Sequence, residues 1–261
     1  MENYLPGVKA SISNAVAKGV EGASEVAILF SGGLDSSLIA LLANYHAENA
    51  EITLYTVGTA DSHDFSNIEQ ASKLLGLNSR RIEICIEDIT GAVPKLFEIT
   101  DCLHPVAISF ELPLYFALER IDDKLVLSGQ GADELFGGYA RYLRMEGEVL
   151  KNVMKKDIDT LITNGIEMEY KIAKHFGKLL KTPYLDEEVV RTAMQIPIEY
   201  KVNEGQRKIV LREVALRLGL PAELANKQKK ASQYSSGILR ELRKMAKNKG
   251  MGVNELIEHL L

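Results

Sequence analysis

Two stretches of the chain combine glycine, serine and aspartate in an order that could bind phosphate. The first, residues 27–40, reads AILFSGGLDSSLIA, an apolar run that leads through SGGLDSS into a helical pattern. Adjacent glycines let the backbone approach an anion without a Cβ in the way. Free N–H groups at the start of a helix attract the same anion. The predicted nucleotide contacts in this loop are Ser31, Gly32, Gly33, Ser36 and Ser37.

Asp35 stands among these donors. A carboxylate there would repel phosphate unless a divalent cation lay between them, so Asp35 is predicted to bind Mg²⁺. No lysine follows the glycines, so the loop is neither the GxxxxGK[ST] motif nor the GxGxxG fingerprint. The alternative is a plain strand–turn–helix connection. The combination of two glycines, three serines and an aspartate between a buried strand and a buried helix favours a functional loop.

The second stretch, residues 125–142, reads LVLSGQGADELFGGYARY and repeats the layout of strand, glycine turn and acidic helix start. In a parallel sheet both turns would lie at the carboxyl ends of strands, where α/β proteins bind their ligands. Ser128 and Gly129 are therefore predicted to contact the nucleotide, and Asp133 to share the metal with Asp35. Alternatively, Asp133 and Glu134 only cap a helix, which leaves the two glycine turns unexplained.

The elements that would position these turns alternate along the first half of the chain. Strands are expected at 25–30, 51–58, 80–86 and 123–129, and helices at 7–20, 36–47, 66–76 and about 111–120. Such alternation favours a parallel sheet with right-handed crossovers. After about residue 140 the strand-like runs disappear and helical segments follow one another. We predict an α/β fold with an ATP-binding region at 1–140 and a helical region at 141–261, joined in one compact unit.

Composition narrows the class of protein. The 261 residues are 46% hydrophobic and 26% charged, with a formal charge of −5, as in ordinary soluble proteins. An acidic balance argues against a dedicated binder of nucleic acid or of membrane surfaces. No signal sequence or membrane-spanning run is evident, which predicts a cytoplasmic protein. Cys85 and Cys102 form no CxxC pair, and Cys85, within IEICI, is expected to be buried.

The loop SGGLDSS resembles the PP-loop of the ATP pyrophosphatase superfamily, which holds the departing pyrophosphate and leaves AMP on the substrate. With SGQGADELFGGY added, nearly the whole chain is similar to the synthetase domain of asparagine synthetase B and its relatives, including β-lactam synthetases. This resemblance implies a Rossmann-like fold of the adenine nucleotide alpha hydrolase type. Further matches follow in the family's order: LYTVG (54–58), TPYLDEEVVRTAMQIP (182–197), KIVLREVA (208–215) and LPAELANKQKKASQYSSG (220–237).

The resemblance implies roles for individual residues. Val57 would pair with adenine through its backbone, and Asp35 and Asp133 would bind Mg²⁺. Lys229 matches the catalytic lysine that the family places beside the α-phosphate and the reacting carbonyl. Lys227 and Lys230 are rivals for this role. Alternatively, these lysines belong to a solvated basic face that continues into the C-terminal helix.

Three departures from the family pattern bear on activity. Gln130 occupies the catalytic position where well-known asparagine synthetases have the Glu thought to deprotonate the nitrogen nucleophile. An amide is no general base, so either another group accepts the proton or ammonia needs no help. Leu179 and Lys181 stand near the place of a family Glu that approaches the second substrate. The glutaminase domain has no counterpart and Glu2 replaces its nucleophilic Cys, so ammonia is expected free or from a separate glutaminase subunit.

These observations predict an ATP- and Mg²⁺-dependent amide-forming ligase. The β-carboxylate of aspartate would be activated as an acyl-adenylate and then amidated by ammonia. One alternative is a PP-loop ATPase acting on another acceptor, such as an RNA nucleobase. Another is a nucleotide-binding partner without turnover, which Gln130 and Leu179 motivate. Apolar residues near both ends are compatible with a homodimer and equally with a monomer.

Overall fold

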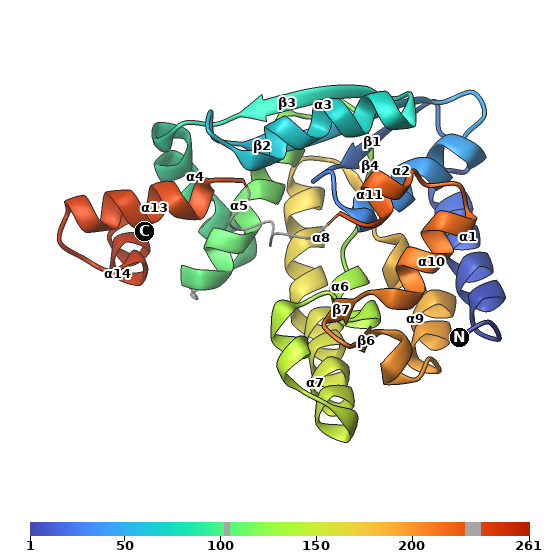
Figure 1. Cartoon of the computed structure of the whole chain (residues 1–261). Coiled ribbons are helices and arrows are strands. Elements are labelled where there is room, and N and C mark those ends of the chain that lie inside the picture. Colours follow the sequence, from blue (N-terminus) through green and yellow to red (C-terminus); the bar gives the residue numbers. More distant parts are fainter. Residues whose placement is uncertain (102–104, 228–235) are drawn as a thin grey trace.

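The computed structural model describes residues 1–101, 105–227 and 236–261, and its centre is a parallel β-sheet (Figure 1). The order across the sheet is β3-β2-β1-β4-β5. All four pairings are parallel, which confirms the predicted α/β class. The strands are β1 (Glu25–Leu29), β2 (Glu51–Gly58), β3 (Asn78–Glu83), β4 (Leu125–Leu127) and β5 (Leu179–Lys181).

Helices cover both faces of this sheet. In the first half they are α1 (Leu5–Val20), α2 (Leu34–His46), α3 (His63–Leu75), α4 (Ile86–Thr100) and α5 (Pro105–Arg120). The second half contributes α6 (Ala132–Phe136), α7 (Gly147–Thr160), α8 (Ile166–His175), α9 (Glu187–Met194), α10 (Ile209–Arg217), α11 (Ala222–Ala225), α13 (Ile238–Asn248) and α14 (Val253–Leu260). Short helical turns are η1 (Ala140–Arg144), η2 (Leu161–Gly165), η3 (Pro183–Leu185) and η4 (Ile198–Tyr200), and the hairpin pairs β6 (Val202–Asn203) with β7 (Gln206–Arg207).

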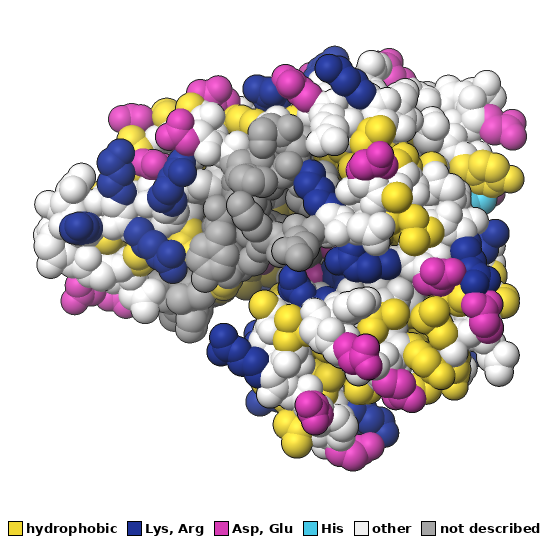
Figure 2. All heavy atoms as spheres, in the orientation of Figure 1, with side chains coloured by type: hydrophobic (Ala, Val, Ile, Leu, Met, Phe, Trp, Pro, Cys, Tyr) yellow, Lys and Arg dark blue, Asp and Glu magenta, His cyan; other side chains and the backbone are white. Residues whose placement is uncertain are grey.

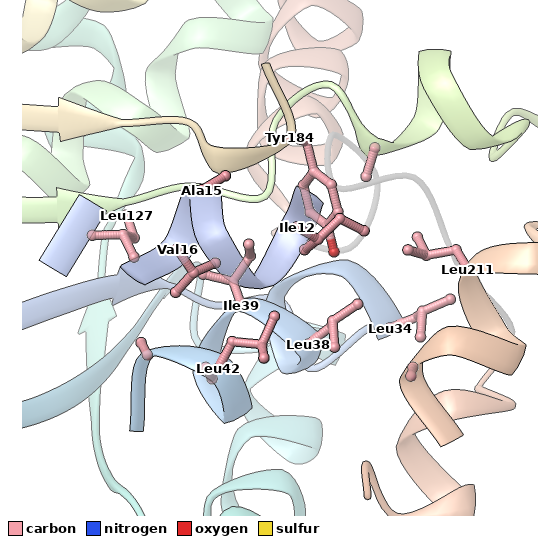
Figure 3. Close-up of a cluster of buried hydrophobic side chains, with 14 of the residues drawn as sticks. Ile12, Ala15, Val16, Leu34, Leu38, Ile39, Leu42, Leu127, Tyr184 and Leu211 are labelled. Carbon is pink, nitrogen blue, oxygen red and sulfur yellow. The ribbon is translucent and has the colours of Figure 1, made fainter. Parts of the chain in front are cut away.

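Alternating side chains divide the core between the two faces of the sheet. Val26 and Ile28 of β1 belong to one buried cluster, whereas Ala27 between them belongs to the other. This follows from the two-residue period of a strand. Figure 3 shows the first cluster, where Ile12 and Val16 of α1 pack over the residues of α2. The second cluster joins α4, α5 and α8 to α13 and α14, which lie at the opposite end of the molecule from α1 (Figure 1).

The strand order places the two predicted turns side by side. The chain runs outward from β1 to β2 and β3, then returns to add β4 on the other side of β1. Their carboxyl ends are therefore neighbours at the point where the order reverses, and α/β proteins bind ligands in the crevice at such a point. The fold thus brings the glycine turns after β1 and β4 to one edge.

Two expectations about secondary structure are wrong. Strand-like runs do not stop at residue 140, because Leu179–Lys181 forms β5 beside β4. Three residues are too few for a detectable period, and this segment is the one that departs from the family pattern. In addition, the third strand ends at Glu83, and exposed Cys85 precedes α4 as its N-cap. The thiol predicted to be buried is therefore at the surface. The division near residue 140 stays a prediction.

Across the described ranges, none of the helices is both long enough and apolar enough to cross a membrane.

Candidate active site

The phosphate loop connects β1 to α2 through a tight turn. Gly32 has φ of 68°, in the left-handed region that glycine adopts without strain. The Ser31 N–H donates to Ser36 Oγ (3.4 Å), and this hydroxyl lies 3.4 Å from the Gly33 carbonyl oxygen, to which it donates. Ser37 Oγ is buried and has no hydrogen-bond partner among the described residues. A buried hydroxyl of this kind normally has a partner, and a phosphate oxygen would supply one.

The second turn presses directly against this loop. A Cβ on Gly129 would lie 3.4 Å from Asp35 Cβ and 3.4 Å from the Ser36 nitrogen. Glycine here allows the backbone after β4 to touch the start of α2. Ser128 anchors the same turn, because its N–H donates to the Lys181 carbonyl of β5 (2.9 Å) and its Oγ accepts from the Gln130 N–H (3.3 Å).

Lys208 joins the two predicted metal ligands. Its Nζ lies 2.5 and 2.6 Å from the carboxylate oxygens of Asp35, and 2.5 Å from Asp133 Oδ1. Lys208 is only 3% exposed, so the three charges form a buried cluster. Gly138 makes room for it, since a Cβ there would lie 1.8 Å from Asp133 Oδ1. Asp35 and Asp133 therefore face a single position that a positive charge occupies.

This arrangement fits a divalent cation. Mg²⁺ in nucleotide sites is held by one or two carboxylates together with phosphate oxygens. Asp35 and Asp133 supply two carboxylates around one cationic position, which Lys208 Nζ fills. Lys208 is not among the site residues predicted from the sequence. The available signal was its place at the start of KIVLREVA, a stretch to which the resemblance attached no residue role.

Segments from the second half of the chain hold the site together. Tyr184 is fully buried, and its hydroxyl donates to the Asp35 carbonyl oxygen (3.1 Å). Arg212 in α10 donates through Nε to the Arg207 carbonyl (3.0 Å) and through Nη2 to the Lys227 carbonyl (3.5 Å). These contacts position the start of the lysine-rich stretch. Lys229 and its rival Lys230 lie outside the described residues, so the choice among the three lysines stays a prediction.

Val57 lies at the same sheet edge. It pairs in register with Ile82 near the end of β2, and the adjacent Thr56 donates to the Phe30 carbonyl oxygen at the start of the phosphate loop (2.5 Å). The Thr59 N–H then donates to the Ser236 carbonyl (2.9 Å), so the chain after the lysine-rich stretch returns to the end of β2. Val57, both turns and the two aspartates therefore share one end of the sheet.

The basic side chains beyond this point are on the surface. Figure 2 shows several Lys and Arg side chains on the outside of the lobe that α13 and α14 form. Arg240 pairs with Asp61 (3.7 Å) and Lys244 with Glu241 (3.8 Å). This part of the cluster is the solvated face that the alternative interpretation expected.

Gln130 contacts a buried carboxylate behind the second turn. Its Nε2 donates to Glu169 Oε1 of α8 at 2.6 Å, and Glu169 is 6% exposed. Burial, with the Glu111 carboxylate of α5 as the next cause, raises the pKa of Glu169 well above its ordinary value. Burial also raises the pKa of Glu111 to about 7. Neither glutamate had been singled out, because both lie in ordinary helical patterns.

These raised pKa values predict that the chain loses stability as pH rises towards neutrality. Folded chains retain protons on Glu111 and Glu169 at pH values where unfolded chains have released them. The free energy of unfolding should therefore fall between about pH 5 and 7.5. The E169Q substitution should flatten this slope by up to about 1.4 kcal/mol per pH unit. Urea unfolding of wild type and E169Q at a series of pH values measures this slope, and E167Q, at an exposed position, is the control. Equal slopes for wild type, E169Q and E167Q would contradict the prediction.

Comparison with known proteins identifies the family. The family described as asparagine synthase matches residues 7–152 and 145–251. A putative glutamine-hydrolyzing asparagine synthetase of Methanocaldococcus jannaschii is 36% identical, over 96% of this chain and 53% of its own length. The carboxyethyl-arginine beta-lactam-synthase of Streptomyces clavuligerus is 28% identical (96% and 48% covered). Asparagine synthetase B of Escherichia coli K12 is 27% identical (81% and 41%). The chain thus spans about half the length of these relatives, and it belongs to the asparagine synthase family.

Proposed function

We propose that this chain activates a carboxylate with ATP and converts it to an amide with ammonia, and that the carboxylate is the β-carboxylate of aspartate. One observation carries the proposal. Two glycine turns from adjacent parallel strands direct Asp35 and Asp133 at a single cationic position. This geometry suits a metal-complexed triphosphate, and the resemblance of SGGLDSS to the PP-loop points to cleavage between the α- and β-phosphates.

The first step is adenylation. An oxygen of the carboxylate attacks the α-phosphorus, the bond from that phosphorus to the oxygen bridging the α- and β-phosphates breaks, and pyrophosphate leaves. The phosphate loop would hold the departing pyrophosphate through backbone N–H groups and the hydroxyls of Ser31, Ser36 and Ser37. Ser37 Oγ supports this role, because it is buried and lacks a partner among the described residues.

Negative charge develops on the departing pyrophosphate in this step. Mg²⁺ held by Asp35 and Asp133 would neutralise charge on the phosphate oxygens. The metal and Lys208 Nζ compete for the same position. When the metal binds, Lys208 would therefore give up its contact with one or both aspartates and contact a phosphate oxygen. By resemblance, Lys229 would stabilise charge that develops at the α-phosphate.

The second step forms the amide. Ammonia attacks the acyl carbon of the adenylate, the bond from carbon to the phosphate oxygen breaks, and AMP leaves. The nitrogen sheds a proton in this step. The relatives support this overall reaction, since two of them are described as asparagine synthetases that hydrolyse glutamine and a third as a beta-lactam synthase. Ammonia would reach the site free or from a separate glutaminase subunit.

Isotope exchange tests the two steps separately. Purified chain with ATP, Mg²⁺ and aspartate should incorporate labelled pyrophosphate into ATP, because adenylation is reversible before ammonia is added. Addition of ammonium chloride should then yield asparagine and AMP in equal amounts, identified by mass spectrometry. Glutamate is the matched control, since it carries the same groups with one more methylene and should support little exchange.

If another carboxylate supported pyrophosphate exchange and aspartate did not, the proposed adenylation would stand, but the assignment of aspartate as the substrate would be refuted. Tight ATP binding without exchange for any amino acid would refute the proposed reaction.

A further inference from the structure

Gln130 leaves the second step without an obvious proton acceptor. Gln130 follows Gly129, whose position against Asp35 and Ser36 puts this turn beside the proposed nucleotide site. An amide does not accept a proton at ordinary pH. The group immediately behind it is the Glu169 carboxylate, whose Oε1 lies 2.6 Å from Gln130 Nε2. The carboxylate in contact with Gln130 is therefore on α8.

Glu169 has an environment suited to a base. It is 6% exposed, and α8 packs against α5, which carries Glu111, and against α4. The charged groups that act on it are the carboxylates of Glu111 and of Glu134 in α6, both of which favour its protonated form. No Lys or Arg among the described residues forms an ion pair with Glu169 or Glu111. Two carboxylates that raise each other's pKa in this way each hold a proton more readily than either would alone.

A purely structural role explains this pair poorly. The contact between Gln130 and Glu169 needs only an acceptor at position 169, which an amide oxygen would provide without a buried charge. Burying an acid without a cation costs stability. Gln130 offsets part of that cost, because its donated hydrogen bond favours the ionised form of Glu169. The hydrogen bond also fixes the carboxylate beside the turn that lines the site.

We propose that Glu169, held by Gln130 and paired with Glu111, accepts the proton that the nitrogen nucleophile sheds during amide formation. This inference rests on the proposed function, and it assigns the acceptor that Gln130 cannot be. The nitrogen lone pair forms the bond to the acyl carbon, and the carbon–oxygen bond to AMP breaks with its electron pair. One proton passes from nitrogen to a Glu169 oxygen.

The E169Q substitution separates this role from the rest of the site. Glutamine keeps a hydrogen-bonding group of the same size in contact with Gln130 and removes only the basicity. We expect aspartate-dependent pyrophosphate exchange to stay within about threefold of wild type, and the rate of asparagine formation from ammonia to fall roughly 100-fold or more. E167Q, an exposed position on the same helix, should leave both rates unchanged. A thermal melt of each variant confirms that it is folded.

The pH dependence of the rate of amide formation is a second, independent test of the role of Glu169. In wild type, amide formation should rise with pH through neutrality as the pair loses its proton, when initial rates are compared at equal concentrations of free ammonia. E111Q removes the carboxylate that opposes ionisation of Glu169, so the rising limb should move to lower pH. A residue that only supports the fold would not shift the limb.

Exchanging the two side chains tests the pairing. In Q130E/E169Q the hydrogen bond is retained with its partners swapped, and one carboxylate remains in the pair. Amide formation should recover at least tenfold relative to E169Q. The inference is overturned if E169Q forms asparagine at the wild-type rate, or if it loses exchange and amide formation equally. Absence of exchange in wild type with any carboxylate would instead refute the proposed function itself.

Discussion

The D133N substitution is expected to reduce aspartate-dependent pyrophosphate exchange roughly 1,000-fold, an effect in the range of losing a major electrostatic contact in a reaction centre. Asparagine removes one of the two negative charges that face the Lys208 position, and a neutral amide oxygen binds Mg²⁺ poorly. The amide can still accept a hydrogen bond from Lys208, so the fold should persist. Exchange kinetics at saturating ATP measure the effect.

The control for D133N is D159N, at an exposed aspartate on α7 far along the chain from either turn. It should exchange pyrophosphate at the wild-type rate. If D133N itself retained exchange within a few-fold of wild type, with a normal dependence on Mg²⁺, Asp133 would not be a metal ligand and the shared metal position would have to be abandoned.

Removal of Lys208 should produce the largest change in stability. In K208A the buried carboxylates of Asp35 and Asp133 lose the cation that they share. Breaking one partner out of a buried charge cluster typically costs about 3–5 kcal/mol. We therefore expect a correspondingly lower free energy of unfolding, measured with urea in the presence of EDTA.

Mg²⁺ should partly reverse this loss. If the metal and the Lys208 ammonium occupy one position, millimolar Mg²⁺ without nucleotide should raise the melting temperature of K208A by several degrees more than that of wild type. K174A, at an exposed lysine of α8, should respond as wild type does. Equal melting temperatures for K208A and wild type, with and without Mg²⁺, would show that the cluster contributes nothing to stability.

The parts of this site that could be predicted from sequence are the local ones. SGGLDSS and SGQGAD each follow directly after a strand and combine a glycine turn with a helix start. Their chemistry can therefore be inferred without knowing the rest of the fold. Their proximity followed from the parallel sheet, because the carboxyl ends of adjacent strands meet at one edge. A Cβ at Gly129 would lie 3.4 Å from both Asp35 Cβ and the Ser36 nitrogen, so the two turns are close together, as that inference requires.

The parts that escaped prediction depend on distant partners. Lys208 is 173 residues from Asp35 in sequence, and nothing in its surroundings distinguishes a buried bridging lysine from a surface one. Glu169 lies in an ordinary amphipathic helix, and only the packing of α8 behind the second turn shows its contact with Gln130. β5 is only three residues long. Its extended conformation depends on pairing with β4 and not on the hydrophobic pattern of its own residues.

The dependence on Lys208 also bears on synthesis of the chain. Translation proceeds from the N-terminus, so both aspartates leave the ribosome well before the lysine that neutralises them. A nascent chain that ends before residue 208 would have the sheet strands in place with two like charges facing each other at its ligand-binding edge. Until Lys208 is added, a cation bound between the two carboxylates would supply the missing positive charge.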